Sequence, residues 1–385
     1  MMRETNQLIE FIRDIFHTHD FIPLHEPSFS GHEKAYVLDT IESTFVSSVG
    51  AYVGQFEEQL STYTGSDFTI ATMNGTAALH TALLLAGVRQ NDIVITQALT
   101  FVATCNAIHY CGAEPAFIDV ARESLGMCPE ALSQFLEEYA ILDDHGDCLL
   151  KETRQKISAC LPMHTFGHPV DLDELESVCQ RWHLPLVEDA AESLGSLYKG
   201  QHTGTRGLVG VLSFNGNKIM TTGGGGAVLT QREELFNQGK HLTTTAKVPH
   251  PFEYVHDQVG YNYRLPNLNA ALGVAQLEQL DEFIIKKRHL ASAYAAFCES
   301  EGIEFLQEPH YARSNYWLNA MICSSMDERN QVLEVTNKQG VMTRPIWKLA
   351  CDLQPYSQAL RGDLSMSRWL ERRVVNLPSS ATAYE

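Results

Sequence analysis

The sequence predicts an α/β protein with a large domain built on a mostly parallel sheet and a smaller C-terminal α/β domain. Short β-rich runs alternate with helical stretches from about residue 68, which is typical of a parallel sheet. The 385 residues exceed one ordinary core, and 44% of them are apolar, which suffices for packed cores. We expect an N-terminal helical segment at 1–30, a large domain at 31–265, and a connecting helix with a small domain at 266–385.

The expected strands of the large domain are short. They are Phe68–Met73, Asp92–Thr96, Pro115–Val120, Ile157–Pro162, Leu184–Glu188, Gly210–Phe214 and Val228–Thr230. The helices expected between them are Ala77–Leu85, Phe101–Cys111 and Asp171–Trp182. A long helix at Asn267–Phe297 leads to the small domain, with expected strands at Asn319–Cys323 and Gly340–Arg344. Ligands of such sheets bind beyond the carboxyl ends of the strands, so polar residues there are the first site candidates.

Charge and cysteine usage exclude several classes of partner. Lys and Arg number 28 and Asp and Glu 47, which gives a formal net charge of −19. Such a chain is a poor ligand for nucleic acid and anionic membranes, although a local site could bind an anionic metabolite. Nine cysteines without a C-x-x-C pair indicate reduced thiols. We see no signal peptide and no apolar run of the ~18 residues that cross a membrane, so we expect a cytoplasmic protein.

The segment Asn74-Gly75-Thr76 follows an expected strand and opens a helix. Backbone N–H groups at a helix start lack acceptors and favour an anion, and a glycine lets a phosphate approach closely. The alternative is a helix capped by Asn74 with no ligand. Alone, the segment does not decide between a phosphate site and a plain cap.

Two acids, Glu188 and Asp189, end the apolar run that begins at Leu184. A carboxylate at this end of a strand is well placed to face a pyridine nitrogen and keep it protonated, so that the ring withdraws electrons. The alternative is a helix N-cap, which is a common role of aspartate.

Lys218 follows another strand, after a polar turn that begins at Ser213. A lysine forms an imine only through its neutral amine, which requires burial or a nearby cation to lower its pKa. The alternative is an exposed surface lysine. The glycines at 223–226 lack the G-x-G-x-x-G spacing of a dinucleotide loop and precede a strand, so we interpret them as backbone packed near a cofactor.

Phe101 begins a helix just after a strand, where an aromatic ring could stack on a flat ligand; the alternative is an ordinary core residue. Each of these features is weak alone. Together they supply, at successive strand ends, a phosphate cup, a stacking ring, a carboxylate and an imine-forming lysine. These are the parts of a site for pyridoxal 5′-phosphate (PLP), and we expect that cofactor.

Longer runs around these residues resemble a known family. SFNGNKIMTTGGGG, preceded by EDAAES, is similar to the DegT/DnrJ/EryC1/StrS family of sugar aminotransferases, as are NGTAALHTAL, ALTFVAT, HTFGHPVDLDEL and GYNYRLPNLNAALGVAQLEQL. The likeness extends from FIPLHEP (21–27) to NLPSS (376–380). FVSSVGAYVGQFE, HLTTTAKVPHPFEYVHDQVGYNYRLPN and TRPIW resemble the branch of legionaminic acid and bacillosamine-type pathways.

The resemblance implies a type I PLP fold and a homodimer with shared active sites. It implies two catalytic residues, Lys218 as the Schiff-base lysine and Asp189 as the partner of the pyridinium nitrogen. The other cofactor-binding residues that it implies are Gly75, Thr76 and Ser213 at the phosphate, Phe101 on the ring, Glu192 near the ring hydroxyl, and Asn262 from the neighbouring subunit.

The implied reaction moves an amino group from an amino acid, expected to be glutamate, to C4 of a 4-keto-6-deoxy nucleotide sugar. The sugar is expected to be linked to UDP and N-acetylated at C2. A transaminase acting at C3, a dehydratase and a non-enzymatic nucleotide-sugar sensor are the alternatives. Lys218 disfavours a dehydratase, because the dehydratases of this family carry histidine at that position.

Other histidines and arginines give weaker signals. His164 and His168 are four apart, but the Phe-Gly between them disfavours a helix, so we expect no metal site and a loop that lines the cofactor cleft. The histidine-rich loop at 241–256 is either solvated or binds a diphosphate across the dimer interface. Arg264 and Arg344 are candidate anion contacts.

Overall fold

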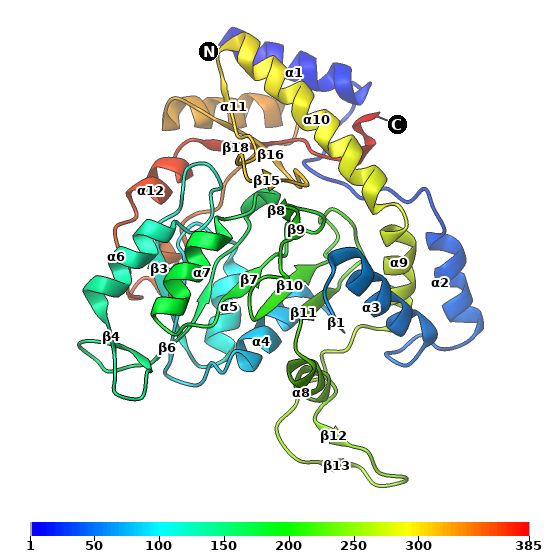
Figure 1. Ribbon diagram of the computed structural model, residues 1–385. Coiled ribbons are helices and arrows are strands. Elements are labelled where there is room, and N and C mark those ends of the chain that lie inside the picture. Colours follow the sequence, from blue (N-terminus) through cyan, green and yellow to red (C-terminus); the bar gives the residue numbers. More distant parts are fainter. Residues whose placement is uncertain (1, 385) are drawn as a thin grey trace.

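The structure is a computed structural model that describes residues 2–384, and a mixed β-sheet forms its centre (Figure 1). Two hydrogen-bonded groups of strands make up the sheet, and parallel bridges join them between β6 and β7. In spatial order the strands are β3 (Glu114–Ile118), β2 (Ile93–Gln97), β6 (Ile157–Leu161), β7 (Val187–Asp189), β10 (Val209–Ser213), β11 (Gly226–Thr230) and β1 (Phe68–Thr72). Only the two pairs made by β11 are antiparallel, so the prediction of a mostly parallel sheet is confirmed.

Both faces of this sheet are buried, which explains why its strands are apolar throughout rather than alternating. Along β11, Val228 packs on one face with residues of α4 and α5. Its neighbours Ala227 and Leu229 pack on the other face with residues of α3 and α9. The helices around the sheet are α2 (Glu33–Glu42), α3 (Ala51–Thr64), α4 (Gly75–Leu85), α5 (Val102–Tyr110), α6 (Pro129–Tyr139), α7 (Leu172–Arg181), α8 (Glu233–Thr243) and α9 (Asn267–Leu277).

A second, antiparallel sheet forms in the C-terminal part. Its strands, in order, are β14 (Glu304–Phe305), β16 (Asn319–Ile322), β18 (Val374–Leu377) and β17 (Arg344–Pro345). The helices of this part are α10 (Leu280–Glu301), α11 (Met326–Lys338) and α12 (Ser365–Glu371). The N-terminal helix α1 (Met2–Phe16) packs here as well, because Leu8, Ile9 and Ile12 share a buried cluster with Tyr294 and Val375. Both chain ends therefore lie on this side of the molecule (Figure 1).

The prediction of one long helix at 267–297 is wrong in one respect. It is two helices, α9 and α10, with a break at Glu278 and Gln279. Neither residue is glycine or proline, and apolar positions continue on both sides of the break. The sequence therefore carries no local signal for the change of direction.

The strand expected at Gly340–Arg344 is also displaced. Gly340 has a φ of +76° and turns the chain at the end of α11, where a side chain would be strained. Val341 makes a single bridge to Ile22, and regular pairing begins only at β17. The other expected strands and helices are present with ends that differ by a few residues, whereas the domain division at residues 30 and 265 stays a prediction.

A hairpin arm extends from the body below α8 (Figure 1). It contains β12 (Lys247–Val248) and β13 (Val255–His256), and its side chains Phe252 and Tyr254 are 84% and 82% exposed. Within residues 2–384, no helix has the length and apolar composition that crossing a membrane requires.

Gly226 lets β11 approach the start of α4. A methyl group added there would lie 2.6 Å from the carbonyl carbon of Asn74 and 2.7 Å from the nitrogen of Gly75. We expect Gly226→Ala to lower the free energy of unfolding by about 1–3 kcal/mol, because backbone must move to make room. Urea unfolding followed by circular dichroism measures this change.

Gly224→Ala is the matched control. The nearest atom to its added methyl group would be the carbonyl oxygen of Met73, at 3.9 Å. The control should therefore change the unfolding free energy by less than about 0.5 kcal/mol. Equal unfolding midpoints for the two variants would contradict the prediction.

Candidate active site

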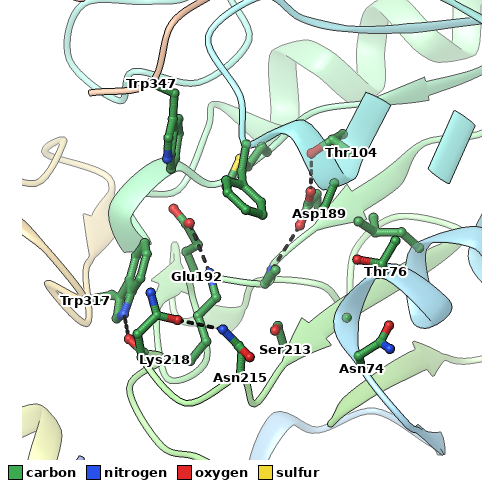
Figure 2. A pocket seen from close by; sticks show the side chains of 17 residues that line it. Asn74, Thr76, Thr104, Asp189, Glu192, Ser213, Asn215, Lys218, Trp317 and Trp347 are labelled. Atoms are coloured by element: carbon green, nitrogen blue, oxygen red, sulfur yellow. Dashed lines mark hydrogen bonds and ion pairs between the residues drawn. The ribbon is translucent and has the colours of Figure 1, made fainter. Parts of the chain in front are cut away.

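A cavity of about 310 Å³ lies at the carboxyl ends of the central strands (Figure 2). This is where open α/β sheets bind their ligands. Loops after successive strands supply one side of it, and Trp317 and Trp347 reach it from the C-terminal part. All of the expected site residues except Asn262 line this cavity: Gly75, Thr76, Phe101, Asp189, Glu192, Ser213 and Lys218.

The start of α4 forms the first wall. The side chain of Asn74 caps the helix by accepting a hydrogen bond from the N–H of Ala77 at 2.8 Å. The N–H groups of Gly75 and Thr76 have no intrahelical acceptor at this position, and the positive end of the helix dipole favours an anion. Ser213 lies against them, since a Cβ on Gly75 would come within 2.9 Å of its Oγ. The helix is thus capped, and its start still suits a phosphate.

Asp189 ends β7 with only 2% of the residue exposed. Its Oδ2 accepts a hydrogen bond from the Thr104 hydroxyl at 2.8 Å, and its Oδ1 accepts one from the N–H of Ala191 at 3.2 Å. Burial raises the pKa of this carboxyl, while both hydrogen bonds act in the opposite direction. Turns rather than a helix follow Asp189, so the N-cap alternative is wrong.

Lys218 follows β10 through a turn in which its N–H donates to the carbonyl of Asn215 at 3.0 Å. Its Nζ lies 3.1 Å from Oε1 of Glu192 and 4.0 Å from the centre of the Trp317 ring (Figure 2). The side chain is 11% exposed, so the surface-lysine alternative is wrong. Both the carboxylate and the indole face favour a charged ammonium group.

Glu192 lies in the turns after Asp189, and 1% of its side chain is exposed. Its Oε2 accepts a hydrogen bond from the N–H of Phe166 at 3.0 Å, while Oε1 faces Lys218. Burial raises the pKa of Glu192 to about 7 against the lowering effect of the lysine charge. This carboxyl therefore exchanges its proton near neutral pH.

Aromatic rings form the wall on the side of the C-terminal part. Phe101 precedes the first turn of α5 and is 46% exposed, so the core alternative is wrong. The ring centre of Trp347 lies 6.2 Å from that of Phe101 and 5.2 Å from that of Phe166. Trp317 completes this wall beside Lys218 (Figure 2).

Thr104, Trp317 and Trp347 are among the cavity residues to which the sequence assigns no role. Thr104 stands three residues after Phe101 on a helix, and this spacing places both on one face. Helical periodicity could therefore have indicated Thr104. Trp317 has no comparable local signal, because it meets Lys218 only through packing of the C-terminal part against the large sheet.

Several other candidates lie outside the cavity. Asn262, Arg264 and Arg344 are exposed, and none of them lines it. The glycines at 223–225 form the turn before β11 and do not line it either. The role expected for Asn262 involves a second subunit, so it stays a prediction.

From the sequence, the loop of His164 and His168 is expected to line the cleft. Neither histidine does so, and only the neighbouring Met163 is among the lining residues. Both histidines are buried. Nδ1 of His164 accepts a hydrogen bond from the N–H of Val170, so its ring proton is on Nε2, which donates to Glu188 at 3.0 Å. Among residues 2–384, no group of three or more His, Cys, Asp and Glu side chains could hold a metal.

Comparison with known proteins places the chain in a family. The DegT/DnrJ/EryC1/StrS aminotransferase family matches residues 27–383. The chain belongs to this family. It is therefore a PLP-dependent transaminase of fold type I.

Named relatives cover most of the chain. EpsN of Bacillus subtilis, whose name describes a pyridoxal phosphate-dependent aminotransferase, is 37% identical over 331 residues, 86% of this chain and 82% of EpsN. GDP-perosamine synthase of Escherichia coli O157:H7 is 34% identical over 93% of each chain. The structure of Helicobacter pylori PseC shares the fold with a TM-score of 0.84 at 23% identity over 94% of each chain. These relatives do not distinguish the legionaminic acid branch within the DegT family.

The residues of the cavity fit PLP. A buried carboxylate is costly unless it is paired, and among the described residues Asp189 has hydrogen bonds but no ion pair. The protonated ring nitrogen of bound PLP would supply the missing positive charge. The uncapped N–H groups at Gly75 and Thr76 suit the phosphate, and Lys218 offers an amine to the aldehyde.

The Thr104 hydroxyl offsets the effect of burial on Asp189. We expect Thr104→Val to weaken PLP binding about tenfold, because a hydrogen bond to a charged group contributes roughly 1.5 kcal/mol. Equilibrium titration of the cofactor-free protein with PLP measures this change. Thr104→Ser retains the hydroxyl and should bind as the parent protein does; unchanged affinity in the valine variant would contradict the assignment.

Proposed function

We propose that this transaminase aminates the keto carbon of a nucleotide-linked sugar, with Lys218 bonded covalently to PLP. The arrangement of Lys218 carries the proposal. The lysine follows a strand, its side chain is 11% exposed, and it is paired with Glu192. It shares one cavity with the carboxylate of Asp189, which has no ion pair among the described residues. A lysine and a carboxylate in these two places suit the aldehyde and the ring nitrogen of one cofactor.

Each residue has a separate task in this proposal. Bound PLP supplies an electron-withdrawing ring and carries the migrating amino group. Lys218 moves the proton at the reacting carbon as general base and general acid. Asp189 keeps the ring nitrogen protonated, and Thr104 and the N–H of Ala191 hold its carboxylate in place. The phosphate binds at the start of α4, beside Ser213.

We propose glutamate as the donor and a UDP-linked, 2-acetamido 4-keto-6-deoxy sugar as the acceptor. The runs typical of the legionaminic acid and bacillosamine-type branch support this acceptor. The likeness to GDP-perosamine synthase supports a nucleotide sugar and makes GDP the competing nucleotide. Binding a diphosphate to a chain of net charge −19 requires local cations, and Arg264, Arg344 and Lys247 are the candidates.

We propose a homodimer as the active unit. Four apolar side chains on α2 and the segment after it are each more than half exposed: Leu38, Ile41, Phe45 and Val49. Exposed apolar side chains gathered in this way mark association sites. Asn262 is exposed too, and we propose that it reaches the phosphate of the partner subunit. The nine free cysteines support a reducing cytoplasm as the location.

Lys218→Ala tests the covalent bond. We expect the variant to lose the visible absorbance that the parent protein shows with PLP, because no other lysine is among the described residues that line the cavity. Turnover should fall on the order of 10³-fold or more. Lys218→Arg is the control that keeps a positive charge and cannot form the bond. A Lys218→Ala variant with the parent turnover would refute the assignment.

A panel of keto sugars tests the acceptor. We expect the protein, supplied with PLP and glutamate, to form a C4 amine from the UDP-linked 2-acetamido 4-keto-6-deoxy sugar, as identified by NMR of the product. Faster conversion of the GDP-linked sugar would overturn the nucleotide assignment. Amination at C3, or loss of a hydroxyl group without amination, would assign the protein to another reaction. No reaction of bound PLP with glutamate would favour a sensor.

A further inference from the structure

The groups around Nζ of Lys218 stabilise a positive charge, whereas the bond to PLP requires a neutral amine. Its Nζ lies 3.1 Å from a carboxylate oxygen of Glu192 and 4.0 Å from the centre of the Trp317 ring. Both neighbours stabilise the positive charge. An amine attacks an aldehyde through its free electron pair, so one proton must leave Lys218 before the bond to PLP can form.

Glu192 is the group that can take this proton. Its Oε2 is fixed by the N–H of Phe166 at 3.0 Å, and this contact aims Oε1 at Nζ of Lys218 (Figure 2). Asp189 instead accepts its hydrogen bonds from a threonine hydroxyl and a backbone N–H. The Glu192 side chain is 1% exposed, and burial disfavours the separated charges relative to a neutral acid beside a neutral amine.

We propose that Glu192 is the base that accepts the proton from Lys218 when PLP is loaded. This inference rests on the proposed bond between Lys218 and PLP. Two of the three ammonium protons leave with the aldehyde oxygen as water, one of them by way of Glu192. The third proton stays on the nitrogen as the C=N bond forms. Glu192 ends as a carboxylate again, so the step needs no further reactant.

Other titratable groups near the site behave differently. Burial, together with the charges of Lys287 and Lys218, holds the pKa of His25 well below its ordinary value, so His25 is neutral near pH 7. Burial lowers the pKa of Lys287 to about 7, and its Nζ donates to two backbone carbonyls. The charge of Asp189 raises the pKa of Glu192. A substitution of Glu192 removes the titration of this carboxyl and leaves that of Lys287 in place. The two contributions to a pH profile can therefore be told apart.

Rapid mixing of cofactor-free protein with PLP tests the proposal, with the rise of visible absorbance as the readout. For the parent protein we expect the loading rate to rise with pH and level off above about pH 7, because only the carboxylate form of Glu192 accepts a proton. Glu192→Gln should load about 10- to 100-fold more slowly at neutral pH, and its rate should keep rising with pH as solution base takes over.

Three comparisons make the outcome decisive. Lys218→Ala measures the absorbance of PLP that binds elsewhere on the protein. If the parent protein shows no more visible absorbance than this variant, the bond between PLP and Lys218 is refuted. A Glu192→Gln rate profile equal to that of the parent protein would refute only the role of Glu192. Glu192→Asp keeps a carboxylate with a shorter reach, so it should load more slowly and still level off. A Glu192→Asp profile identical to that of the parent protein would also count against the proposal.

Discussion

The burial of the Asp189 carboxylate without a cationic partner is the constraint around which the site is organised. Thr104 and the N–H of Ala191 supply hydrogen bonds, yet burial still raises the pKa of this carboxyl. An uncompensated buried charge disfavours the folded state, so a ligand that brings a protonated nitrogen stabilises it by linkage. In the proposed function, the same cavity would bind the phosphate through backbone N–H groups at a helix start, which require no lysine or arginine. Bound PLP would therefore complete the charge balance of the site.

The part of the site that the sequence could predict is the part that the sheet itself positions. Gly75, Phe101, Asp189 and Ser213 are far apart in the chain, but each follows or ends a strand. The carboxyl ends of parallel strands share one edge of a sheet, so strand order brings these residues together without any knowledge of packing. The fold class follows from the same alternation of strands and helices, and most element ends lie within a few residues of the prediction.

What the sequence could not predict depends on contacts between distant segments. Trp317 contacts Lys218 only because the C-terminal part packs against the large sheet, and no local pattern encodes that docking. The break between α9 and α10 carries no glycine or proline signal. The surface alternative for Lys218 is decided by its burial, and the N-cap alternative for Asp189 by the turns that follow it; both are properties of the folded chain. The role expected for Asn262 depends on contacts with a second subunit, and no local sequence pattern encodes such contacts.

The docking of α1 on the C-terminal sheet has a consequence for how the protein folds. Leu8 and Ile12 share a buried cluster with Val375 and Leu377 of β18, so a helix near residue 10 packs on a strand near residue 375. Contacts between segments so far apart in the sequence form slowly, because the entropy of closing the long intervening loop must be lost first. Until β18 is in place, the α1 residues of this cluster can pack only on its earlier members, such as Tyr294 of α10. The complete burial of α1 is therefore a late step in folding, which waits for β18, the strand of the C-terminal sheet that comes last in the sequence.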